Sequence, residues 1–142
     1  RMFDSAGIPA MKEPTGLSRS DGRRPDGMSL IPWQSGKSLT WDVTVATTLA
    51  DSYINATASC AGAAAELAAN RKTAKYADLP ASYIFQPIAI EMLGPMNDSA
   101  VEFFCELGRR IVSRTVGLTQ TVKRGSRDRF SVPTFIHHHA AF

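Results

Sequence analysis

Two aspartates in the first third of the chain, Asp26 and Asp42, are the side chains best placed to do chemistry. They lie in apolar runs on either side of the turn-prone pair Ser35-Gly36, a pattern that predicts a β-hairpin. Pairing about this turn puts residue 26 roughly opposite residues 44–46, so we expect a bulge or strand bend to bring Asp26 nearer to Asp42. Two carboxylates that converge at a strand pair make a plausible Mg²⁺ site.

The strand around Asp42 separates apolar from polar side chains. Trp41 and Val43 share one face, and Asp42 and Thr44 share the other. An aspartate inside so apolar a strand is costly unless it is exposed, paired or bound to a cation. The alternative is purely structural, since Pro-Asp-Gly at Asp26 is a common turn and Asp42 would face solvent on a half-buried strand.

Residues 59–78 form the clearest helix of the sequence, because the segment is rich in alanine and Pro80 follows its end. The spacing of Lys72, Lys75 and Tyr76 places all three on one helix face. The alternative interpretation is that these lysines are solvated charges that favour the helix dipole at the C-terminus.

Taken in order, these segments resemble the PD-(D/E)xK nuclease superfamily, and most of all the restriction-like endonuclease domains of LINE-type retrotransposon polyproteins. In those domains a Pro-Asp precedes an apolar-Asp-Val-Thr-Val strand, and a helix ending in Lys-x-x-Lys-Tyr follows. The resemblance covers about residues 8–112, and Pro25-Asp26, residues 41–45 and residues 72–76 carry it. The chain departs from the superfamily pattern at Thr44, where a lysine is usual.

The resemblance implies Mg²⁺-dependent hydrolysis of DNA phosphodiesters, with Mn²⁺ as a substitute ion. Asp26 and Asp42 would hold the metal together with the backbone carbonyl of Val43. Lys72 or Lys75, supplied from the helix in place of a strand lysine, would orient the attacking water. The domain would act on nuclear DNA as part of, or as a descendant of, a polyprotein that includes a reverse transcriptase.

Residues 15–24 are rich in Ser, Gly, Arg and Asp and read as a loop. Arg19, Arg23 and Arg24 give it positive charge directly before the first aspartate, which suits contacts to phosphates. By the resemblance, Tyr76 would help these arginines to position the DNA strand. A solvated linker is the alternative interpretation of the loop.

Composition sets loose bounds on the protein. With 142 residues, of which 44% are hydrophobic, the chain can bury one core. A net charge of +3 permits a polyanionic partner without requiring one. Two cysteines are too few for a disulfide framework, which favours a reducing compartment. No apolar run is long enough to span a membrane and no signal peptide opens the chain, whose first residue, Arg1, suggests a fragment.

The predicted fold is α/β: a restriction-endonuclease-like mixed sheet flanked by helices, with the first core helix largely missing. The elements that we expect are the tail of a helix over residues 3–7, strands over residues 10–13, the two hairpin arms, the crossover helix, a strand over residues 83–91 and a last helix from residue 97 or 98. Pro87 indicates that the fourth strand is an edge or carries a bulge. The apolar face of the last helix is predicted to consist of Val101, Phe104, Cys105, Gly108, Ile111 and Val112.

We expect residues 1–114 to form this domain and residues 115–142 to be an irregular basic tail, disordered or aberrant. Asp51 is a weaker candidate for a third acid, and residues 137–139 are histidines without acid or Cys partners at ligand spacing. Two other functions stay open. One is a catalytically inactive retroelement remnant that binds nucleic acid, and the other is a plain α/β interaction domain whose acids are structural.

Overall fold

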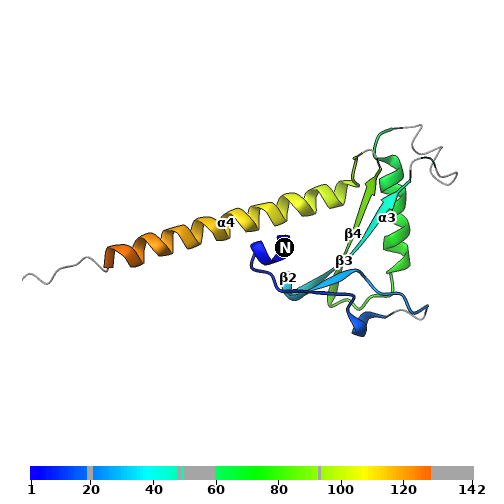
Figure 1. Cartoon of the computed structure of the whole chain (residues 1–142). Coiled ribbons are helices and arrows are strands. Elements are labelled where there is room, and N and C mark those ends of the chain that lie inside the picture. The colour runs from blue at the N-terminus through cyan, green and yellow to red at the C-terminus, as the bar shows by residue number, and fades with distance from the viewer. Residues whose placement is uncertain (19–20, 48, 50–59, 93, 129–142) are drawn as a thin grey trace, which may run out of the picture.

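A four-stranded mixed β-sheet lies between helices on its two faces in the computed structural model, which describes residues 1–18, 21–47, 49, 60–92 and 94–128 (Figure 1). In chain order the elements are α1 (Met2–Ser5), β1 (Ala10–Lys12), the 3₁₀ helix η1 (Thr15–Leu17), β2 (Gly27–Gln34), β3 (Lys37–Ala46), α3 (Ala63–Lys75), β4 (Tyr83–Glu91) and α4 (Asp98–Asp128). The predicted mixed α/β architecture is therefore confirmed.

The strand order is β1-β2-β3-β4, with β1, β2 and β3 antiparallel and β4 parallel to β3. Ser35 and Gly36 both have positive φ, at 49° and 74°, so the β2–β3 turn has the backbone twist that tight hairpins prefer. The parallel pair requires a crossover, and α3 supplies it. Pro87 lies on β4 at the edge of the sheet, where its missing N–H is tolerated, as the sequence predicts.

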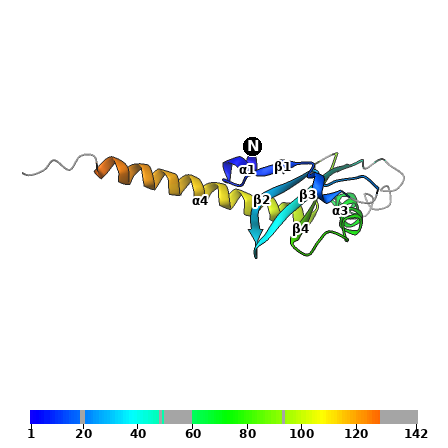
Figure 2. The same ribbon diagram turned by 90° about the horizontal axis from the view of Figure 1, so that it is seen from below.

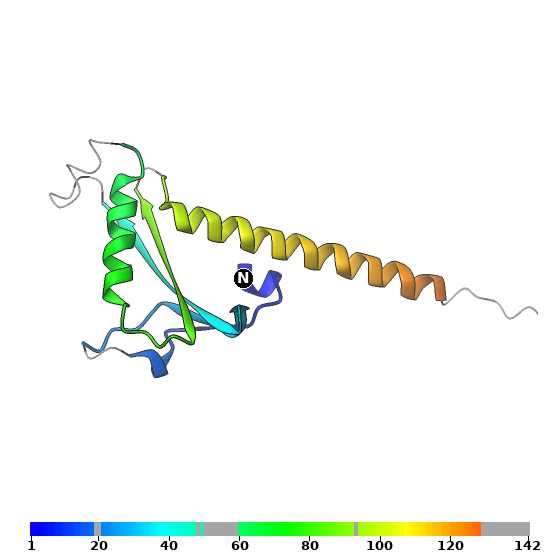
Figure 3. The ribbon, with the colours of Figure 1, turned by 180° about the vertical axis from the view of Figure 1, so that it is seen from behind.

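Figures 2 and 3 show α3 on one face of the sheet and α4 on the other, and each face has its own core. Towards α3, small side chains let helix and sheet approach closely: the buried residues are Ala46, Ala64, Ala65, Ala68, Ala69 and Ala89. Towards α1 and α4 the core is larger and aromatic, and its buried members are Ile8, Leu39, Ile88, Ala100, Phe103 and Leu107. The face of β3 that carries Asp42 is therefore the α3 face.

The predicted buried face of the last helix is partly wrong. Val101 and Val112 are 44% and 62% exposed and Cys105 is exposed, whereas Phe103 and Leu107 are buried. Apolar residues lie on more than half of the circumference of α4, so the sequence alone allows two overlapping helix faces to be the buried one. Packing of Phe103 against Trp33, with ring centroids 5.4 Å apart, selects the helix face that packs on the sheet.

The C-terminal boundary also differs from expectation. Residues 115–128 continue α4 as regular helix, and Figure 1 shows this half extending away from the sheet. Here Val116 and Leu118 remain 50% and 57% exposed, because none of the elements that the structure describes covers them. Residues 129–142, which include the three adjacent histidines, lie outside the described part of the chain. Among the described residues, no helix is both long enough and apolar enough to cross a bilayer.

Candidate active site

An irregular stretch of β2 brings Asp26 level with Asp42. At the turn Gln34 pairs with Lys37, and at the far end Gly27 pairs with Trp41. Between these two pairs β2 advances by seven residues and β3 by only four. A regular ladder would have placed Asp26 opposite Val45, near the expected residues 44–46. That expected register is wrong, and the bulging that the sequence analysis required to close the gap is present.

Ser29 supplies the hydrogen bonds that the irregular stretch would otherwise leave unmade. Its fully buried hydroxyl accepts from the N–H of Leu39 at 2.9 Å and donates to the carbonyl of Ile31 at 2.8 Å. Pro32, which has no N–H to donate, lies between the two register shifts. These two residues let the strand bulge without leaving buried polar groups unpaired.

Asp26 closes the end of the β2–β3 ladder with its side chain. Its Oδ2 accepts a hydrogen bond from the N–H of Val43 at 2.6 Å, and its own carbonyl accepts from the N–H of Glu13 at 3.0 Å. The N–H and C=O of one strand residue point to the same edge. The Val43 carbonyl therefore faces the edge that the Asp26 carboxylate occupies.

Asp42 precedes Val43 on β3, its side chain lies on the α3 face of the sheet, and it is 4% exposed. Its Oδ2 forms an ion pair with Nζ of Lys72, whose side chain is 24% exposed. The prediction that a helix lysine projects over the face of Asp42 is thus met by Lys72. The same contact means that the charge of Asp42 already has a partner within the fold.

A cavity of about 290 Å³ gathers most of the predicted site residues. Its lining consists of Glu13, Gly22, Arg23, Arg24, Asp26, Asp42, Lys75 and Tyr76. Both aspartates line it with one of the two candidate lysines, Lys75, while Lys72 reaches Asp42 from beside it. The structure thus brings together side chains that are up to 63 positions apart in the sequence, from Glu13 to Tyr76.

Glu13 is the residue that sequence analysis missed. It follows β1 directly, with φ at +44°, a left-handed conformation that is uncommon for a residue other than glycine. This conformation and its bond to the Asp26 carbonyl place it in the lining of the cavity. In the sequence, the only signal is an acid between a short strand and Pro14, which is too weak to single it out.

Tyr76 holds the arginine loop. Its side chain is 3% exposed and packs against Phe85 with ring centroids 4.7 Å apart, and its hydroxyl donates to the carbonyl of Arg24 at 2.9 Å. The N–H of Arg23 donates to Oδ1 of Asp21 at 3.1 Å, which tightens the same loop. Tyr76 therefore positions Arg23 and Arg24 beside the acids. Two further candidates, Arg19 and Asp51, lie outside the described residues.

The oxygen donors of the cavity suit a hard cation. Glu13, Asp26 and Asp42 line the cavity with carboxylates, a ligand type that Mg²⁺ and Mn²⁺ accept while they keep several waters. Within the described ranges, no cluster of three or more His, Cys, Asp or Glu side chains has metal-binding geometry.

Comparison with known proteins adds no assignment. No protein-family model matches the chain, and no curated protein matches it.

Proposed function

We propose that this chain is a metal-dependent DNA endonuclease domain of the restriction-like type, derived from a retroelement polyprotein and acting on nuclear DNA. The observation that carries the proposal is the shared cavity of Asp26, Asp42, Lys75 and the two arginines. In chain order these residues come from the loop before β2, from β3 and from α3, which is the order that the PD-(D/E)xK resemblance implies. The mixed sheet with its crossover helix is compatible with that fold.

The charges around the cavity support a phosphodiester as substrate. Arg23 and Arg24 lie on the loop that Tyr76 holds, where they would contact phosphates beside the acids. Asp26 and Asp42, with the Val43 carbonyl, would hold Mg²⁺, which supplies Lewis-acid stabilisation of charge on the phosphate and lowers the pKa of a bound water.

Lysine in this site has two roles to fill. Lys72, in contact with Asp42, would keep the carboxylate oriented, and Lys75 in the cavity wall would offset negative charge that develops on the phosphate. Thr44, where the superfamily has a lysine, has no ammonium to offer. Lys72 and Lys75 would therefore take the place of the superfamily's strand lysine.

A second function has a specific observation in its favour. The ion pair of Asp42 with Lys72 satisfies the carboxylate without any metal, as expected of a domain that retains the fold and binds nucleic acid but does not cut it. In that case the arginine loop would still bind phosphates. A plain interaction domain would show neither cutting nor salt-dependent DNA binding.

A nicking assay separates these functions. The protein is incubated with supercoiled plasmid in Mg²⁺, in Mn²⁺ and in EDTA, beside Asp42→Asn. We expect metal-dependent nicks with 5′ phosphates and 3′ hydroxyls from the natural chain and none from the variant. DNA affinity of Asp42→Asn should persist or rise, because a carboxylate near the phosphates has been neutralised. DNA binding without nicking would support the inactive remnant. Neither binding nor nicking would support the interaction domain.

A further inference from the structure

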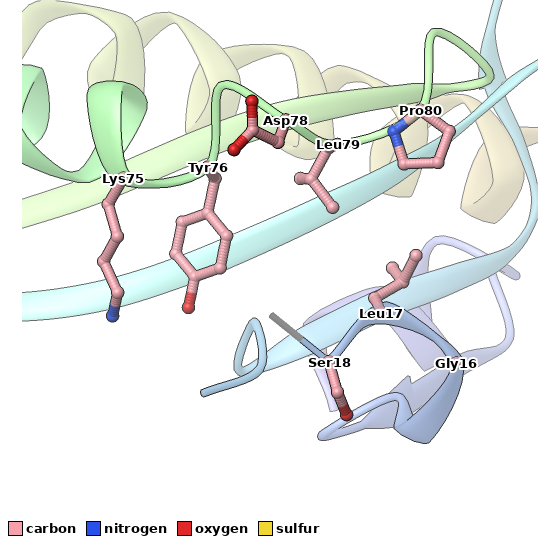
Figure 4. A pocket seen from close by; sticks show the side chains of 8 residues that line it. All are labelled: Gly16, Leu17, Ser18, Lys75, Tyr76, Asp78, Leu79 and Pro80. Atoms are coloured by element: carbon pink, nitrogen blue, oxygen red, sulfur yellow. The ribbon is translucent and has the colours of Figure 1, made fainter. Parts of the chain in front are cut away.

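A second cavity, of about 410 Å³, lies next to the first. Its lining consists of Gly16, Leu17, Ser18, Lys75, Tyr76, Asp78, Leu79 and Pro80, contributed by η1 and by the turn that follows α3 (Figure 4). Lys75 and Tyr76 line both cavities, so the two share a wall. A ligand held by its phosphate in the first cavity would reach the second with its neighbouring groups.

We propose that this second cavity receives an unpaired nucleobase of the strand whose phosphate lies in the first; the inference rests on the proposed binding of nucleic acid. Figure 4 shows Leu17 and Leu79 pointing toward one another across the cavity, with Pro80 beside them. These apolar side chains suit the faces of a base, and the volume falls in the range of small-molecule sites.

The polar groups of the cavity match a nucleotide as well. Lys75 is placed at the junction, where the phosphate would lie, and Asp78 adds a carboxylate to the lining, whereas the Ser18 hydroxyl already donates to the carbonyl of Thr15 at 3.0 Å. A carboxylate only accepts hydrogen bonds, so Asp78 suits the N–H groups that all four bases present and that an abasic site lacks. A base that enters such a cavity must leave the duplex stack, which makes the preferred strand unpaired at this position.

Binding of two strands with equal phosphate charge tests the inference. In EDTA, so that no cutting occurs, a short oligothymidine is compared with an abasic strand of the same length by fluorescence anisotropy. We expect roughly tenfold tighter binding of oligothymidine, because only that strand buries a base against the apolar side chains. Equal affinity of the natural chain for both strands would overturn the inference.

Variants that fill the second cavity test whether the preference for oligothymidine arises there. Gly16 is exposed and a Cβ built on it meets nothing within 4 Å, so Gly16→Phe adds a ring at the rim of the cavity. Leu79→Trp is a second plug should the first fail to fold, because Leu79 faces Leu17 across the cavity (Figure 4). The matched control is Gly117→Phe on α4, also without neighbours within 4 Å. The plugs should bring the affinity ratio near one, and the control should retain it. A ratio that survives both plugs would contradict the inference.

The result is independent of the nicking assay. A base preference without nicking would support the cavity and contradict the nuclease, whereas nicking without a base preference would do the reverse.

Discussion

Asp42 and Lys72 form an ion pair where β3 meets α3, beside the cavity that Asp26 and Lys75 line. The carboxylate is almost fully buried and the lysine is three-quarters buried. Removing one member of such a pair leaves the other charge without its partner in a poorly solvated place. Loss of either member alone should therefore destabilise the fold.

We expect Lys72→Met to lower the free energy of unfolding by about 3 kcal/mol in metal-free buffer, the lower end for a broken buried pair because the lysine is partly exposed. The Asp42→Asn/Lys72→Met double variant should lose less than the sum of the single losses, since no unpaired charge remains. Urea denaturation of the four proteins measures this. Strictly additive losses would mean that the two charges do not interact.

Substituting the two lysines separately tells which one acts in cleavage. Met keeps the length and packing of a lysine stem without its charge. Lys75→Met should slow nicking by about two to three orders of magnitude, as loss of one charge-stabilising group does in other sites, with little change in stability. Lys37→Met, at the exposed hairpin turn, is the control for loss of one positive charge. If Lys72→Met and Lys75→Met both nick at the natural rate, no helix lysine takes part.

Removing Arg23 and Arg24 should weaken DNA binding about equally for all sequences. Each lost phosphate contact should reduce the slope of log affinity against log salt by about one. The control is Arg109→Ala on α4, which pairs with Glu106 and does not line the cavity. A salt slope unchanged by the double substitution would place the DNA elsewhere. Arg19→Ala, tested separately, extends the same measurement to the third predicted arginine.

Gly27, beside Asp26, has no room for a side chain. A Cβ built there would lie 2.1 Å from Cζ2 of Trp41, and Phe3 stacks on the Trp41 ring at 4.4 Å, so the indole cannot move aside freely. Gly27→Ala should cost about 1–3 kcal/mol in urea denaturation, as overpacking does. Gly16→Ala, in open space, should change stability by less than about 0.5 kcal/mol. Equal effects would show that Trp41 repacks at no cost.

Local chemistry made the elements predictable, and long-range packing decided the rest. The hairpin follows from Ser35-Gly36, and the crossover helix from its alanines and Pro80. The three-residue register shift does not, because it depends on Ser29 replacing ladder bonds and on Trp41 covering Gly27. Sequence spacing likewise put Lys72 and Lys75 on one helix face, but only the fold shows that one pairs with Asp42 and the other lines the cavity.

Mn²⁺ binding followed by electron paramagnetic resonance tests most directly whether Asp26 and Asp42 share one divalent ion. Titration of the natural chain should show one strong site that Mg²⁺ displaces. Asp26→Asn and Asp42→Asn should each weaken this site by at least about tenfold, since each removes a charged oxygen ligand, while Asp78→Asn, in the neighbouring cavity, should leave it unchanged. Retention of the strong site in both Asp26→Asn and Asp42→Asn, or its absence from the natural chain, would contradict the metal-dependent nuclease.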